Sequence, residues 1–121
     1  MFVQEINWLD PVAHEAEITV TDGEFSIKCY SYPCYYLPGE VLVDRLECFD
    51  AKEVVRVRGE RPSVYKQGMA FGYFLCGKVI DYATGEICIG KLRIGIDRYA
   101  IPGDISNGDF VCFSTSRVDV W

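Results

Sequence analysis

The chain has 121 residues, of which half are hydrophobic and a quarter charged, and its formal net charge is −6. This length fits one domain with a real hydrophobic core, and no apolar run approaches the roughly 20 residues of a membrane-spanning helix. The acidic charge argues against nucleic acid as the main partner, because binding there depends on neutralising phosphates. The N-terminus lacks the basic and apolar regions of a secretion signal, so we expect a soluble, cytoplasmic, single-domain protein over residues 1–121.

Taken in chain order, the elements predict an all-β protein. Residues 4–10 (QEINWLD) fit either a short helix or an edge strand. Beyond residue 15, helical periodicity is nearly absent, β-branched and aromatic residues dominate, and Gly-containing turn signals recur, as in sandwiches and barrels. We expect strands at 15–22, 24–32, 40–49, 52–58, 69–80, 86–96 and 109–121. We expect loops at 61–68 and 97–108.

Alternation assigns faces to these strands, because successive side chains of a strand point to opposite sides. In the strand at 24–32, one face carries Phe25, Ile27 and Cys29. The other face carries Lys28, Tyr30 and Tyr32. In a continuous strand at 86–96, the residues sharing one face would be Cys88, Leu92, Ile94 and Ile96. The residues of the opposite face would be Ile87, Ile89, Lys91 and Arg93. Several strands are thus apolar on both faces, which favours a barrel with a partly covered outside.

The order of elements resembles the OB-fold group of small β-barrels. The resemblance rests on the hairpin at 15–32, the strand at 40–49, the long hairpin at 69–96 and the final strand. The stretch PGDISNGDFVCF is also similar to the usual approach to a last barrel strand. It implies a small closed or partly open antiparallel barrel, but such barrels host many unrelated functions. An OB-fold usually has a helix before its fourth strand, so either residues 50–60 are partly helical or the barrel is a variant.

Six cysteines stand in a chain without an export signal, and we expect them to be reduced and mostly buried, as small hydrophobes. Cys29 falls on the apolar face of its strand. Cys34 follows Pro33 in a turn, and it is the thiol that we expect to be exposed. The six residues are Cys29, Cys34, Cys48, Cys76, Cys88 and Cys112.

Motifs for catalysis or metal binding are absent. Cys29 and Cys34 are spaced as C-x4-C but lack a second pair, and His14 stands alone among acidic residues. There is no C-x-x-C, no nucleophile elbow and no H-E-x-x-H motif, and the carboxylates fall mostly in turns. The stretch GEICIGK matches the core of a phosphate loop but lacks the following Ser or Thr and the helix. We therefore expect no catalytic residues, no metal and no cofactor.

A binding surface is the remaining option. Aromatic and cationic side chains gather on one face of the strand at 24–32 and in the turn after it, and more arginines lie nearby in sequence. Tyr and Arg are enriched in protein interfaces, and aromatics interleaved with cations also stack single-stranded bases. We expect a non-enzymatic, immunity- or adaptor-type protein that binds another protein. The alternative is single-stranded nucleic-acid binding, an enzyme is third, and the tyrosines could instead only cap the barrel end. The candidate residues are Lys28, Tyr30, Tyr32, Tyr35, Tyr36, Arg56 and Arg58.

Overall fold

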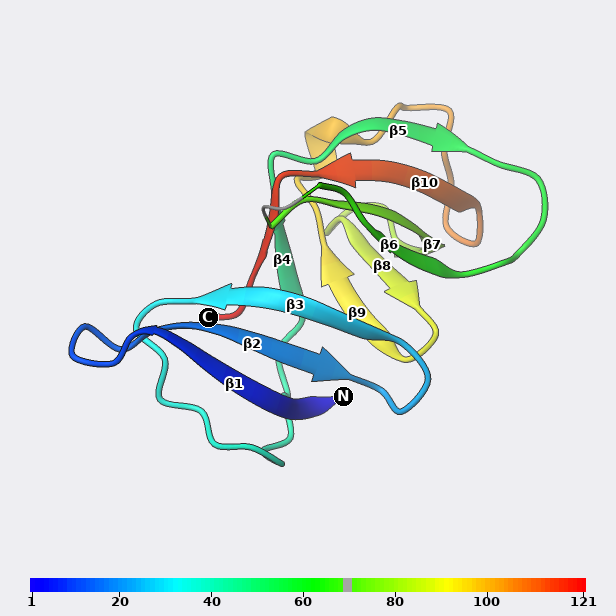
Figure 1. The fold of residues 1–121 in the computed structure, drawn as a ribbon. Helices are drawn as coiled ribbons and strands as arrows, with labels where there is room; N and C mark the ends of the chain where they lie inside the picture. Colours follow the sequence, from blue (N-terminus) through cyan, green and yellow to red (C-terminus); the bar gives the residue numbers. More distant parts are fainter. Residues whose placement is uncertain (69–70) are drawn as a thin grey trace.

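The computed structural model describes residues 1–68 and 71–121, and it confirms the all-β class (Figure 1). Within those residues, eleven strands belong to one sheet, and the 97–108 loop contains a short 3-10 turn, η1. No helix among them is long and apolar enough to cross a membrane. The elements are β1 Phe2–Asp10, β2 Glu15–Thr21, β3 Ser26–Ser31, β4 Leu46–Phe49, β5 Lys52–Arg56, β6 Ser63–Lys66, β7 Tyr73–Asp81, β8 Glu86–Ile89, β9 Leu92–Gly95, η1 Arg98–Ala100, β10 Phe110–Thr115 and β11 Arg117–Asp119.

The strand order is β1-β2-β3-β11-β4-β9-β8-β7-β10-β5, and β6 pairs with β7 beside this path. The sheet is not closed by hydrogen bonds, so it is consistent with a small β fold without confirming a closed barrel. The expected purely antiparallel arrangement is wrong. The chain returns its last strand, β11, between β3 and β4, where it runs parallel to β3, and β4 runs parallel to β9.

Two bent stretches of chain run along each other through the middle of the molecule. The first consists of β4 and β5, and the second of β10 and β11, which are separated by Ser116 alone. Their antiparallel register continues across the bend, from Val111↔Arg56 in β10–β5 to Asp119↔Glu47 in β11–β4. In Figure 1, β4 runs upward from the layer of β1–β3 below to the group of β5, β10, β6 and β7 above.

The predicted hairpin at 15–32 is confirmed as β2 and β3, and residues 4–10 belong to an edge strand, β1, rather than a helix. The strand predicted at 40–49 is wrong over 40–45. Its first residues bond to the free edge of β1 instead, because the Val3 N–H donates to the Glu40 carbonyl and the Leu42 N–H to that of Met1. Only Leu46–Phe49 forms β4.

The loop expected at 61–68 contains a strand, β6, which pairs with the half of β7 that β8 leaves uncovered. The start of the next predicted strand, residues 69–70, lies outside the described residues. The end of the chain is also divided, since β10 and β11 replace the single strand expected at 109–121. At both places, partners distant in sequence decide where a strand begins and ends.

The stretch 86–96 folds as the tight hairpin of β8 and β9 rather than as one strand. Gly90 takes φ of 59° in the turn, and a Cβ there would lie 2.8 Å from an Asp22 carboxylate oxygen. The turn changes the parity of the alternation, so the predicted faces are wrong beyond it. Four buried residues face the core together as the pairs Ile87↔Ile94 and Ile89↔Leu92.

The core lies on one face of the sheet, and a small second cluster lies on the other face of β7 and β10. Alternation along β10 explains the division, because Val111 and Phe113 belong to the main core whereas Phe110 and Cys112 pack in the second cluster with Cys76. The largest fully buried side chains are Phe113, Ile18, Ile27, Leu46, Leu75, Ile87, Ile89, Leu92 and Ile94.

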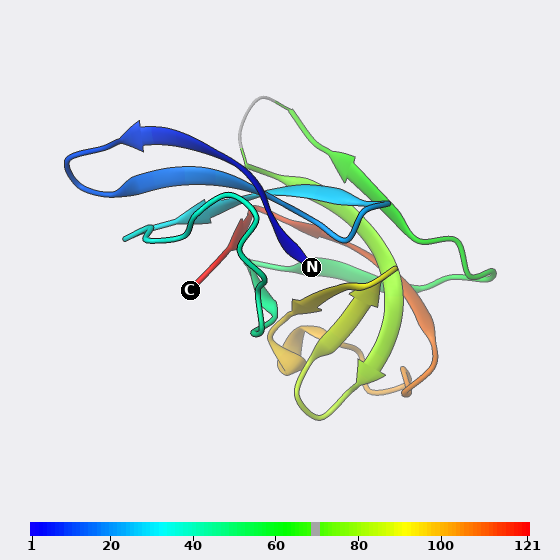
Figure 2. The ribbon, with the colours of Figure 1, turned by 90° about the horizontal axis from the view of Figure 1, so that it is seen from below.

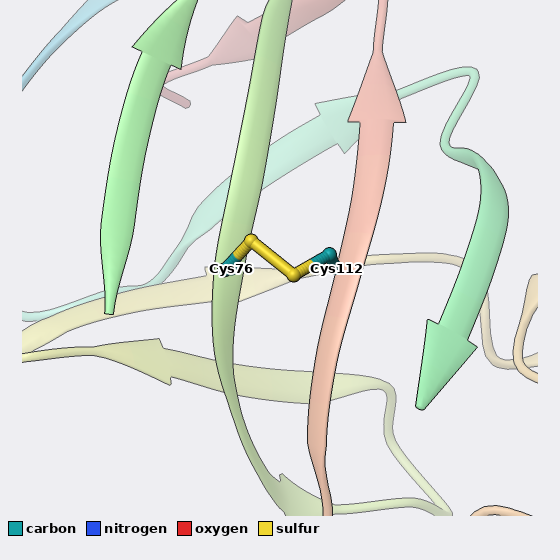
Figure 3. The surroundings of a disulfide bond; sticks show 2 residues. All are labelled: Cys76 and Cys112. Carbon is teal, nitrogen blue, oxygen red and sulfur yellow. A yellow bond between two sulfur atoms is a disulfide. The ribbon is translucent and has the colours of Figure 1, made fainter. Parts of the chain in front are cut away.

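The expectation that all six cysteines are reduced is wrong for two of them. Cys76 and Cys112 stand opposite each other in the β7–β10 ladder, with Cα atoms 4.1 Å apart, and form a disulfide (Figure 3). The expectation that Cys34 is exposed is also wrong. The segment after β3 folds back over the core, where the Cys34 N–H donates to the His14 carbonyl at 2.7 Å and its side chain is fully buried.

Candidate binding site

Lys28 and Tyr30 on β3, with Tyr32 just beyond its end, share the outer face, as alternation predicts, because the intervening Cys29 and Ser31 are buried. Neighbouring strands pair two of these polar groups. The Lys28 ammonium lies 3.8 Å from a carboxylate oxygen of Glu17 on β2.

The Tyr30 hydroxyl donates to the carboxylate of Glu15. This hydrogen bond favours the protonated phenol and, together with burial, raises the pKa of Tyr30 above its ordinary value. Tyr30 is therefore anchored to β2 rather than free to swing onto a ligand.

Arg117 on β11 lies between two aromatic rings. Its guanidinium carbon is 4.7 Å from the ring centroid of Tyr30 and 5.1 Å from that of Phe49 on β4, which is cation–π geometry. Its Nε and one Nη bond to the two carboxylate oxygens of Asp119 at 2.6 and 3.1 Å. That bidentate bond raises the pKa of Arg117 above its ordinary value, so the guanidinium stays charged.

A hollow of about 220 Å³ opens beside this stack, and we call it the aromatic hollow. The side chains of Tyr32 and Trp121 at its rim are 54% and 76% exposed, whereas Asp119 is only 6% exposed. The hollow thus combines exposed aromatic walls with a nearly buried, already paired carboxylate. Its lining residues are Tyr30, Tyr32, Arg117, Asp119, Val120 and Trp121.

Two further hollows, of about 190 and 700 Å³, adjoin Trp121 and share Val43, Asp44 and Arg45. We call them together the acidic groove. Figure 2 shows the turquoise chain segment before β4, which forms one wall, beside the red C-terminal end. The charged residues of the groove are Glu40, Asp44, Arg45, Glu47, Asp81, Glu86 and Arg93.

Both arginines of the acidic groove are already engaged. The Arg45 Nε bonds to Glu47 at 2.7 Å, and Arg93 bonds to Glu86 at 3.0 Å. The hydrogen bond that Arg93 donates to Glu86 raises the pKa of Arg93, so this guanidinium also remains a cation held by that carboxylate. Asp44 makes no hydrogen bond or ion pair with any residue that the structure describes.

The two tyrosines after β3 have separate environments. The Tyr36 hydroxyl donates to the Trp121 carbonyl, and burial, followed by the charges of Glu40 and Asp44, raises the pKa of Tyr36. Tyr35 is exposed, and its ring centroid lies 4.8 Å from that of His14. Tyr36 therefore belongs to the acidic groove, while Tyr35 belongs to a contact with the β1–β2 turn.

The predicted arginines do not join this surface. Arg56 lies on β5, the last strand of the path, where it bonds to the Asp104 carbonyl at 3.3 Å and to the Asp109 carboxylate at 3.5 Å. Arg58 is exposed in the turn beyond β5. Figure 1 shows β5 and β3 in different layers, so the structure does not bring these arginines together with the tyrosines of β3.

Sequence reasoning missed the residues that complete the site, namely Phe49, Arg117, Asp119 and Trp121. One signal was available for three of them. In the final SRVDVW, Val118 and Val120 are buried, so the alternating Arg117, Asp119 and Trp121 fall on the other side. The approach of Phe49 depends on β11 pairing with β4, which no local pattern reveals.

The thiols of Cys29 and Cys48 lie near Asp119 but do not line the aromatic hollow. Burial, followed by the charges of nearby groups, raises the pKa of the Cys29 thiol, and burial also raises that of Cys48 against a hydrogen bond with Thr115. Among the described residues, no group of three or more His, Cys, Asp or Glu side chains could hold a metal ion. No protein-family model, curated protein or solved structure matches this chain.

Proposed function

We propose that this chain is a non-enzymatic binding protein of the immunity or adaptor type, and that its partner is another protein. One observation carries the proposal. Exposed aromatic side chains, Tyr32 and Trp121, rim a hollow whose polar groups are already held by ion pairs. Interface anchors are typically aromatic residues on a well-packed base that needs little reordering on binding.

The charges of this surface favour a protein over single-stranded nucleic acid. Aromatic platforms for bases need cations that remain available for phosphates. Here the guanidinium of Arg117 is occupied by Asp119, and the ammonium of Lys28 faces Glu17. The net charge of −6 points the same way.

The absence of catalysis remains part of the proposal, and so does the cytoplasmic location, against which the Cys76–Cys112 disulfide counts, because such bonds are rare in reducing compartments. The surface described above is what supports the binding role. The raised pKa values of Cys29 and Cys48 keep these two thiols protonated near neutral pH, which fits the absence of a nucleophilic role for them.

The proposal is tested by affinity capture from a lysate of the cells that express the chain, with the wild type beside the Tyr32→Ala/Trp121→Ala double variant. Both side chains are exposed, so we expect the variant to fold normally and to lose the partner. Tyr30 is avoided, because removing its ring would also remove the support of Arg117. Tyr65→Ala on β6, also exposed, is the control that should retain the partner.

A titration with a fluorescent single-stranded oligonucleotide at low and raised salt addresses the rival function. We expect no binding at low salt. The proposal fails if the double variant captures the same proteins as the wild type, or if oligonucleotide binding depends on Tyr32 and Trp121.

A further inference from the structure

The indole of Trp121 stands between two surfaces of different chemistry. It lines both the aromatic hollow and the acidic groove. Val43, on the groove side, is 80% exposed, and Tyr32 is the exposed wall of the hollow. Apolar side chains therefore continue across both surfaces, and a single ligand could contact them together.

The acidic groove has an excess of negative charge that its own residues do not neutralise. Five carboxylates and two guanidinium groups line it, and each guanidinium is committed to a carboxylate. Asp44, at the centre of the shared wall, has neither hydrogen bond nor ion pair within the described chain. The charge of Asp44 acts on Arg93 only at longer range, so a cation placed directly over Asp44 would gain a stronger attraction, and the same field would speed its arrival.

The aromatic hollow differs in both charge and size. Its one cation and one carboxylate, Arg117 and Asp119, neutralise each other, so its walls favour an apolar or aromatic guest. Its volume of about 220 Å³ lies below the range of roughly 300–1,000 Å³ that is usual for small-molecule sites. The hollow therefore suits one side chain of a larger ligand.

We propose that the aromatic hollow and the acidic groove together bind an extended basic segment of the partner protein, with an apolar or aromatic side chain in the hollow and a lysine or arginine over Asp44. This inference rests on the proposed function, because it names the chemistry of that partner at the same surface. An extended chain advances roughly 3.3 Å per residue, so a segment of a few residues reaches from the hollow across Trp121 to the groove.

Three fluorescein-labelled peptides separate the two parts of this ligand. GRKLKRG carries cations and an apolar anchor, GRKGKRG lacks the anchor, and GEELEEG keeps the anchor with the opposite charge. We expect the first to bind at low salt, the second about tenfold more weakly, and the third not at all up to about 1 mM. Raising the ionic strength should weaken the first, because exposed charges are screened over roughly 10 Å.

Variants of the full chain assign the binding to this surface. Trp121→Ala should weaken GRKLKRG about 30-fold, as removal of an anchor does, and Asp44→Lys about tenfold or more. Asp104→Lys, a charge reversal in the loop before β10, matches the change of charge at a position outside the groove and should leave the affinity unchanged. Circular dichroism and urea unfolding of each variant show that it folds.

The inference is overturned if GRKLKRG does not bind the wild type, if GEELEEG binds as well, or if Asp104→Lys weakens binding as much as Asp44→Lys. It is also overturned if sedimentation shows a dimer that Trp121→Ala dissolves, since a second copy would then occupy the surface. A Trp121-dependent partner in the capture experiment, together with any of these results, would leave the proposed function standing and remove only the basic segment. Oligonucleotide binding that depends on Trp121 would overturn both the proposed function and the inference of a basic segment.

Discussion

Two regions of the sheet, one around β7 and β10 and the other around β11 and β4, differ in how their strands are held together. We call them the disulfide side and the groove side. On the disulfide side, β7 and β10 pair over six residues and carry the Cys76–Cys112 bond. On the groove side, β11 contacts β3 through the single pair Asp119↔Tyr30, and β4 contacts β9 through two pairs. The aromatic hollow and the acidic groove lie where these ladders are short, and ion pairs and ring contacts stand there in place of backbone bonds.

This difference bears on where the proposed binding would take place. A long antiparallel ladder uses its backbone groups internally and brings its side chains close together. Short ladders use fewer backbone groups, and side chains such as Arg117 then have a larger part in the shape of the surface. We expect the disulfide side to determine stability and the groove side to determine binding.

The largest expected effect is the removal of the disulfide. Replacing Cys76 and Cys112 by Ala should lower the free energy of unfolding by about 4 kcal/mol, from the chain entropy of a loop with a sequence separation of 36. Urea unfolding of the oxidised wild type and the variant measures this, and peptide binding should be unchanged. Titration of thiols in denaturant without reductant should find the four free cysteines only. Six reactive thiols would show that Cys76 and Cys112 are not bridged, and the comparison between the disulfide side and the groove side would then fail.

The next effect concerns the ion pair that shapes the aromatic hollow. Asp119→Ala should destabilise the chain by about 2 kcal/mol, since it removes two charge-assisted bonds and leaves Arg117 unpaired between its rings. The comparison variant on the disulfide side is Arg56→Ala, whose bonds to the Asp104 carbonyl and the Asp109 carboxylate are long and exposed and should together contribute about 0.5 kcal/mol or less. Urea unfolding compares them, and equal losses would contradict the distinction between the two sides.

A smaller effect depends on pH at a junction between the β2–β3 and β8–β9 turns. Burial works to raise the pKa of Asp22, but bonds from the N–H groups of Phe25, Lys91 and Glu24 outweigh it and lower that pKa below 3.8. The bonds favour the ionised form. Their stabilisation is therefore complete above the unfolded pKa and is lost as the pH falls through the folded pKa.

Asp22→Asn should lose the bond from Lys91 and cost about 1 kcal/mol at pH 7. Urea unfolding between pH 7 and pH 2.5 should show the difference from the wild type shrinking below about pH 4, where the unfolded carboxyl becomes protonated. A difference that is independent of pH would show that the amide changes packing rather than charge.

The smallest expected effect is that of Trp121→Ala on stability. Exposed substitutions away from caps and buried networks usually change the free energy of unfolding by no more than about 0.5 kcal/mol. Thermal unfolding checks this, with Tyr65→Ala as a second exposed aromatic. A larger loss would mean that Trp121 supports the fold, and its effect on binding would then have to be measured on Tyr32→Ala alone.

What could be predicted from the sequence is local. The faces of β3 followed from alternation, because β2 and β3 are joined by a short turn and one face must be buried. The environment of Tyr30 could not be predicted, since it depends on Glu15 and on an arginine 87 positions later in the chain. The burial of Cys34 and the strand β6 could not be predicted for the same reason, because each depends on partners distant in sequence. The faces beyond Gly90 failed because a two-residue turn changes the parity of alternation.

The bend at Ser116 joins β10 and β11 into one segment, and this connection couples the pairing of the two strands. One extended segment reaches from the bridged Cys112 to Asp119. It pairs with the bent β4–β5 segment on both sides of the bend, with one register shift between Cys112 and Ser114. If the hydrogen bonds of β10 or of β11 opened, the pairing of the other strand would be disturbed as well. The amides of β10 and β11 should therefore exchange with solvent deuterium as one cooperative unit. A ligand held at Trp121 would then slow exchange as far away as Val111, and the two sides of the sheet would share a single opening event.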